Sequence, residues 1–163
     1  MLFRSVSLAT SSDRTLFFDF LPMEAMAIKG FKTKFQLYTV PGQVIYNTTR
    51  QLVLRGVDGI VFVADSQYDK MAENVESFSN LEENLRALKM NLADLPYVLQ
   101  YNKRDVENPA PVDYMEFLLN NREVVVPSFE ACASRTEGVF ESLNMITRML
   151  LHKFISQGTP QYA

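Results

Sequence analysis

Three apolar segments constrain the fold of this 163-residue chain more than any other feature. The clearest is residues 59–65, whose apolar side chains follow one another without the polar alternation of a half-exposed strand. A continuous apolar run of this length is typical of a strand covered on both faces, as in a parallel sheet. Residues 96–102 have the same character, and residues 124–131 form a third run whose Pro127 favours the edge of the sheet.

Helical periodicity fills the segments between and after these runs. Residues 71–89 and 138–154 each place apolar side chains at helical spacing, a shorter helix is expected over 112–121, and Thr136 is a candidate N-cap for the last one. Strands that alternate with helices of this length indicate an α/β fold with a parallel sheet between two helical layers. The expected buried stripes are Val75, Phe78, Leu81, Leu85 and Leu88 in the first long helix, and Phe140, Leu143, Ile146, Leu150 and Phe154 in the last.

The first third of the chain has a different pattern. Residues 15–21 and 34–40 are extended runs joined by a loop that contains Gly30, which predicts an antiparallel hairpin, and residues 46–55 are expected to form a short helix. The predicted fold is therefore a mixed, mostly parallel sheet that begins with an antiparallel hairpin. One domain accommodates residues 1–163, with residues 157–163 as a flexible tail.

Composition limits the kind of function. The formal net charge of -3 gives no electrostatic reason to expect a nucleic-acid partner. No apolar run reaches the roughly 18 residues that suggest a membrane span. The only cysteine, Cys132, excludes an internal disulfide, and together with the only histidine, His152, it argues against a structural zinc site. A reducing cytoplasm is the expected location.

The most informative polar motif is Asn102-Lys103-Arg104-Asp105, at the carboxyl end of a predicted strand. Ligands of open α/β sheets bind at this edge. The Asp105 carboxylate can accept hydrogen bonds from N1–H and the amino group of guanine, whereas adenine presents an acceptor at N1. Such a site can reject the wrong base by about 10⁴ or more. We predict that the Lys103 stem lies along the base and that Asn102 ties the loop to its neighbours; the alternative is a polar loop with a helix cap.

Three further segments are ambiguous when each is taken alone. Gly42 and Gln43 follow the hairpin, where an ordinary strand-ending turn is the simpler interpretation. Arg14 and Thr15 precede the hairpin in what can equally be a solvated loop. Ala133 follows the third strand, where its backbone N–H can meet guanine O6.

Taken together, several segments closely resemble the MglA-like bacterial Ras-like GTPases of gliding motility and cell polarity. These segments are residues 14–22, 30–34, 37–43, 54–66 and 100–105, and they occur in this order. The sequence Thr39-Val-Pro-Gly-Gln43 is itself diagnostic, because most Ras relatives carry an aspartate where this chain has Thr39. The resemblance implies a Ras-like P-loop NTPase fold over nearly the whole chain.

The resemblance also implies a switch that binds GTP and GDP with Mg²⁺ and hydrolyses GTP. In such a switch a glutamine orients the attacking water, a glycine N–H meets the γ-phosphate and an arginine stabilises the transition state. The implied partners are a roadblock-fold GTPase-activating protein (MglB-like) and polarity or motility effectors, at a cell pole. The implied site residues are Gln43 and Arg14 for catalysis, Thr15 for the metal, and Gly42, Asn102, Lys103, Asp105 and Ala133 for the nucleotide.

One part of the family pattern is missing from these residues. Small GTPases begin with a strand, a phosphate-binding loop of the form G-x-x-x-x-G-K-[ST] and a helix, but none of the six glycines here precedes Lys and then Ser or Thr. Without that central strand, we expect a gap of roughly 10 Å between the hairpin and residues 59–65. We therefore expect an incomplete small-GTPase domain, a fragment that binds and hydrolyses GTP poorly. The alternatives are a catalytically dead partner-binding module derived from the GTPase fold, and a structural α/β domain.

Overall fold

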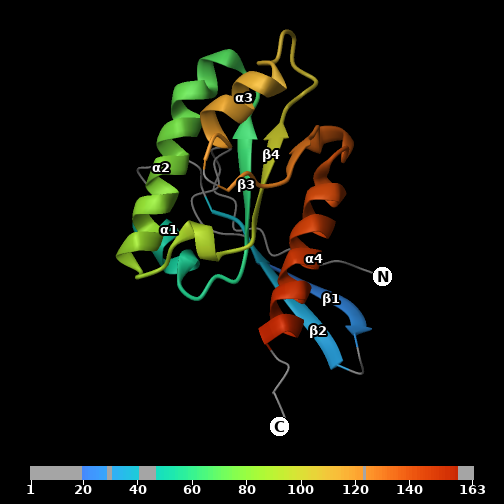
Figure 1. Ribbon diagram of the computed structural model, residues 1–163. Helices are drawn as coiled ribbons and strands as arrows, with labels where there is room; N and C mark the ends of the chain where they lie inside the picture. The colour runs from blue at the N-terminus through green and yellow to red at the C-terminus, as the bar shows by residue number, and fades with distance from the viewer. Residues whose placement is uncertain (1–19, 29–30, 41–46, 123, 158–163) are drawn as a thin grey trace, which may run out of the picture. The chain divides into compact units, whose positions relative to one another are not determined.

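The computed structural model describes residues 20–28, 31–40, 47–122 and 124–157 (Figure 1). The chain divides into two compact units, Met1–Arg55 and Gly56–Ala163. The first unit carries β1, β2 and α1, and the second carries the other helices and strands. Most of the predicted tail, residues 158–163, lies outside the described residues, and the single-domain assignment of residues 1–163 stays a prediction.

The first unit contains the predicted antiparallel hairpin. β1 (Phe20–Ile28) pairs with β2 (Phe31–Tyr38), and the helix α1 (Asn47–Leu54) follows where a short helix was predicted. β1 runs through residues 22–28, which the sequence predicted as loop. That prediction was wrong because the edge of a two-stranded ribbon tolerates the missing donor of Pro22, so pairing with β2 continues past it.

The second unit is built on a parallel sheet of three described strands. β3 (Ile60–Asp65), β4 (Tyr97–Asn102) and β5 (Ser128–Glu130) lie in the order β3-β4-β5. The register joins Asp65 to Asn102, so β3 and β4 end side by side at their carboxyl ends. The three apolar runs therefore form the predicted parallel strands, and β5 lies at the edge that Pro127 indicated.

β5 is shorter than the predicted run of residues 124–131. The side chain of Asn120 accepts a hydrogen bond from the Val126 N–H at 3.0 Å and donates one to the Val126 carbonyl at 2.9 Å. An asparagine side chain thus takes the place of a neighbouring strand at Val126, while Val124 and Val125 are exposed. The valine-rich composition predicted a strand, but this local side-chain pairing holds Val126 outside the ladder.

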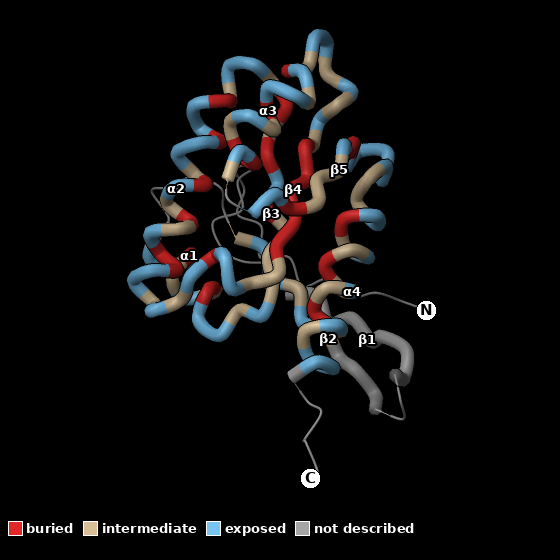
Figure 2. The backbone as a smooth tube through the Cα atoms, in the orientation of Figure 1, coloured by how far each residue is buried: buried red, intermediate tan, exposed pale blue. Residues whose placement is uncertain are grey.

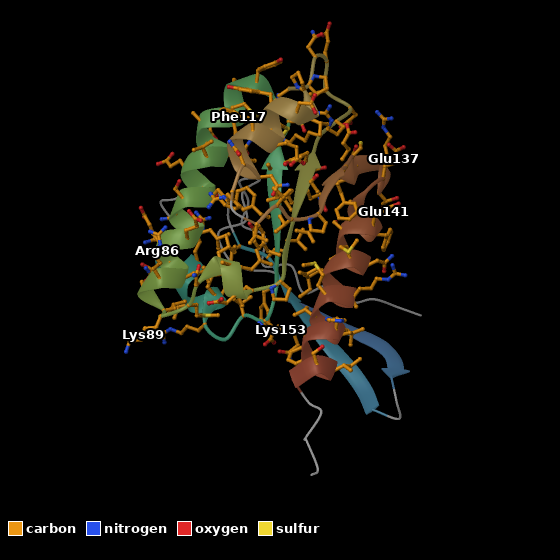
Figure 3. All side chains as sticks on the ribbon, in the orientation of Figure 1. Arg86, Lys89, Phe117, Glu137, Glu141 and Lys153 are labelled. Carbon is orange, nitrogen blue, oxygen red and sulfur yellow. The ribbon has the colours of Figure 1, made fainter. Side chains whose placement is uncertain are left out.

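Helices cover both faces of this sheet. α2 (Met71–Ala87) and α3 (Val112–Leu119) pack together on one side, and α4 (Val139–Gln157) packs on the other (Figure 1). The buried positions concentrate along β4 (Figure 2), as expected for a central strand between two helical layers. Phe117 instead points outward from α3 (Figure 3). Among the described helices, none combines the length and apolarity that crossing a bilayer would require.

In both long helices, some of the residues that face the sheet differ from those that the apolar stripes predicted. In α2, Asn74 is buried while Val75 is exposed. In α4, Ser142 is fully buried while Phe140 is 62% exposed. These parts of the predicted stripes were wrong because Asn74 and Ser142 each make a specific hydrogen bond to the sheet, which fixes the rotation of its helix.

Thr136 is not the N-cap of α4. It lies in a left-handed conformation with φ 62°, and its hydroxyl donates to the Arg135 carbonyl at 2.6 Å. The helix begins only at Val139, after Gly138. The cap prediction was wrong because the threonine hydroxyl is used within the loop that precedes the helix.

Replacing Ser142 with alanine is expected to lower the free energy of unfolding by about 1–3 kcal/mol. The Ser142 hydroxyl donates to the Gln100 Oε1 at 2.6 Å, and both residues are buried. Removing the donor leaves the Gln100 acceptor desolvated and unpaired. Urea unfolding measures the change, with Ser79→Ala on the exposed face of α2 as the control, expected to stay within about 0.5 kcal/mol. Equal losses for the two variants would contradict the role of this bond.

Candidate functional site

The carboxyl edge of the parallel sheet brings together four of the predicted site residues. Asn102 ends β4, and Lys103 and Asp105 follow it directly. Ala133 begins the short helix η4 (Ala133–Arg135), just after β5. Since parallel strands end at a common edge, residues from two strand ends meet there.

Asn102 ties this edge together. Its Oδ1 accepts a hydrogen bond from the Ala133 N–H at 2.9 Å, and its backbone carbonyl accepts one from the Ser66 N–H at 3.0 Å. The prediction that Asn102 binds the loop to its neighbours is confirmed. The Ala133 N–H was also predicted to donate a hydrogen bond to guanine O6. In this structure it donates to Asn102. A hydrogen bond from Ala133 to a base stays a prediction.

Asp105 presents an ionised carboxylate at the same edge. Its Oδ2 accepts a hydrogen bond from the Ser134 hydroxyl at 3.3 Å and lies 3.9 Å from the Arg135 guanidinium. A hydrogen bond with Cys132, and then bonding to its own backbone, holds the pKa of Asp105 below its ordinary value. The carboxylate is therefore an acceptor-only group at neutral pH, which is what two adjacent donors on a ligand require.

Lys103 has a left-handed backbone conformation. Its φ is 63°, in the left-handed region that side-chain-bearing residues seldom adopt. Its ammonium donates to the Asp65 Oδ2 at 2.6 Å and to the Gln67 Oε1 at 3.4 Å. Sequence reasoning gave Asp65 no role, although a signal was available: Asp65 is the polar residue that ends the strand next to β4.

Arg104 anchors the loop through its side chain and its backbone. Its Nε donates to the Glu130 carboxylate at 2.9 Å, and its guanidinium donates to the Ala110 carbonyl at 2.6 Å. Its backbone N–H donates to the Ala131 carbonyl at 3.0 Å. The loop is thus fastened to β5 through Arg104, which leaves the side chains of Lys103 and Asp105 to line the edge of the sheet.

The remaining predicted site residues lie outside the described residues. They are Arg14 and Gln43, predicted for catalysis, Thr15, predicted for the metal, and Gly42, predicted for the phosphate. Their roles stay predictions.

Comparison with known proteins identifies the family of this chain. A sequence profile of the Ras family matches residues 1–152. The chain belongs to the Ras family. It is 51% identical over 146 residues to the mutual gliding-motility protein MglA of Myxococcus xanthus, which covers 90% of this chain and 74% of that protein. This similarity confirms the resemblance to MglA-like small GTPases and, with the sheet described above, the predicted Ras-like fold.

More distant relatives agree with the family. The chain is 28% identical over 127 residues to the Ras-related protein Rab-13 of Canis lupus familiaris, covering 77% of this chain. It is 29% identical over 132 residues to Rab-13 of Mesocricetus auratus, covering 80% of this chain. The chain spans 60% of the length of the first of these Rab proteins and 62% of the second.

Proposed function

We propose that this chain binds guanine nucleotides as a small GTPase of the gliding-motility switch type, and that Asp105 selects the base. The observation that carries the proposal is the position of the Asp105 carboxylate at the ligand edge of the sheet, where it contacts Ser134, the residue that follows Ala133. Guanine offers N1–H and an amino group as adjacent donors and O6 as an acceptor. The carboxylate fits the two donors, and the Ala133 N–H fits O6 once Asn102 shares it.

GTP and GDP with Mg²⁺ are the proposed ligands. Bound Mg²⁺ would supply positive charge that offsets the charge of the phosphates. Thr15 is proposed to hold the metal, Gly42 to meet the γ-phosphate, and Gln43 and Arg14 to act in hydrolysis. Because these 163 residues contain no G-x-x-x-x-G-K-[ST] sequence, we propose that contacts to the base provide most of the affinity and that hydrolysis by this chain is slow.

The proposed partners rest on the resemblance to MglA-like GTPases. The name of the Myxococcus xanthus relative states a role in gliding motility. We propose a cytoplasmic switch of motility or polarity, located at a cell pole. It would act with a roadblock-fold activating protein of the MglB type and with polarity or motility effectors.

A titration with GDP and ADP tests the proposal, since the two ligands carry the same phosphates and differ only in the base. We expect GDP to shift the backbone amide resonances of residues 102–105 and 133 in a ¹H–¹⁵N spectrum of the 163-residue chain, and ADP at the same concentration to leave them unchanged. Equal binding of both nucleotides would contradict base selection by Asp105. Binding of neither would favour the alternative, a partner-binding module derived from the GTPase fold.

A further inference from the structure

The Asp65 carboxylate is held from several directions at the carboxyl end of β3. Its Oδ1 accepts a hydrogen bond from the Gln67 N–H at 3.0 Å, and its Oδ2 accepts one from the Lys103 ammonium at 2.6 Å. The Asp65 side chain is 20% exposed, whereas that of Lys103 is 52% exposed. The carboxylate is therefore the fixed partner of this pair, and the lysine is the partner that would otherwise move.

Asn74 of α2 fixes the backbone beneath this carboxylate. Its side chain accepts a hydrogen bond from the Asp65 N–H at 3.0 Å and donates one to the Asp65 carbonyl at 2.8 Å. Asn74 is buried, so this pair of bonds is shielded from water. Helix α2 thus supports Asp65, and Asp65 supports the side chain of Lys103.

Lys103 needs such support if its stem is to contact a base. A lysine side chain has four rotatable bonds and loses much conformational freedom when it is ordered. Its backbone is already turned into the left-handed region, with φ 63°, which directs the loop but leaves the side-chain torsions free. Anchoring the ammonium at the β3 end fixes both ends of the stem, so the methylene groups span the edge between β3 and β4.

We propose that Asp65 is a positioning residue that holds the Lys103 stem against the face of the bound base. This inference rests on the proposed function, because it gives a role to a residue beside the guanine site. The stem touches the ring face, which all purines share, whereas Asp105 meets the edge that distinguishes them. Asp65 therefore sets the affinity for a purine nucleotide and has no part in choosing between guanine and hypoxanthine.

A double-mutant cycle on GDP affinity tests this role. Asp65→Asn keeps an acceptor for the Gln67 N–H but removes the charge that anchors Lys103, and we expect it to weaken GDP binding about fivefold. Lys103→Met keeps the length of the stem without the ammonium and should weaken binding to the same extent. In the Lys103→Met background, Asp65→Asn should have no further effect, since interacting residues are not additive.

Two controls separate positioning from other effects. Asp69→Asn removes the same charge from an exposed carboxylate nearby and should leave GDP affinity unchanged. The ratio of GDP to inosine diphosphate affinity should be the same in Asp65→Asn as in the parent chain, because only the ring face is affected. If Asp65→Asn does not fold, Lys103→Met alone decides: unchanged GDP affinity in that variant overturns the inference.

The outcomes distinguish this inference from the proposed function. A chain that binds GDP equally well with and without the Asp65 carboxylate overturns the inference and leaves the function in place. Equal weakening by Asp65→Asn in both backgrounds shows that Asp65 does not act through Lys103, and also overturns it. A parent chain that binds no GDP refutes the proposed function, and the role of Asp65 with it.

Discussion

Replacing Gly138 with alanine is expected to lower the free energy of unfolding by about 3 kcal/mol, from the left-handed backbone and the overpacking together. Gly138 has φ 72°, and an added Cβ would lie 1.9 Å from the Glu130 carbonyl oxygen and 2.8 Å from the Ala131 Cα. Both of these are backbone atoms at the end of β5, so no side-chain rotation relieves the contact. Either the start of α4 or the end of β5 must move.

Gly56 provides a matched control for this substitution. It also has a positive φ, 70°, but among the described residues no atom lies within 4 Å of the position of an added Cβ. Gly56→Ala should therefore cost only the conformational term, about 1 kcal/mol. Urea unfolding of the two variants measures the difference, and similar losses would show that crowding at Gly138 has no effect.

The position of Gly138 also matters for the site. The loop before it is closed by two hydrogen bonds, from the Cys132 N–H to the Glu137 carbonyl at 2.9 Å and from the Glu137 N–H to the Cys132 carbonyl at 3.2 Å. This loop carries Ala133 and Ser134, which contact Asn102 and Asp105. Displacement of the loop by Gly138→Ala should therefore shift the amide resonances of Ala133 and Ser134 even where the variant remains folded.

The sequence was sufficient to predict the parallel strands and the residues at their carboxyl ends. Continuous apolar runs are typical of buried parallel strands, so β3 and β4 were found within a residue of their ends, although Val63 of β3 is 51% exposed and that strand is not covered on both faces along its whole length. The Asn102–Asp105 segment follows β4 without an intervening loop, so its place at the sheet edge followed from the strand alone. These predictions depended only on the residue types within each short segment, and not on contacts with distant parts of the chain.

The polar residues that fix the helices and the site side chains against the sheet could not be predicted from local composition. Hydrophobic periodicity assigns polar side chains to the outside, so it placed Val75 rather than Asn74 against the sheet. Asn74 is buried because it pairs with the backbone of Asp65, a partner nine residues earlier in the chain. Asp65 could be noted from the sequence as a polar residue at a strand end, but its contact with Lys103 was not predictable, because it forms only when β3 and β4 lie in register.

Asp105→Asn is expected to reverse the base preference of the chain, weakening GDP binding about 100-fold and making xanthosine diphosphate the better ligand. The carboxylate offers acceptors to both donors of guanine, N1–H and the amino group. An asparagine amide offers one acceptor and one donor, so its NH₂ faces the guanine amino group and leaves both unpaired. Xanthine carries an oxygen in place of that amino group, which the amide NH₂ can meet.

The expected 100-fold loss of GDP affinity is smaller than the roughly 10⁴-fold discrimination that a fully buried site can reach. The reason is that the Asp105 side chain is 30% exposed, so water can solvate part of the mismatch. Asp113→Asn on α3 is the matched control: it removes the same charge from an exposed carboxylate and should leave the affinities for both nucleotides unchanged. Titration of each variant with GDP and xanthosine diphosphate gives the ratio directly. If Asp105→Asn weakened the binding of both nucleotides equally, the carboxylate would act through the fold of the loop. A reversed ratio of GDP to xanthosine diphosphate affinity requires that this side chain contacts the base edge.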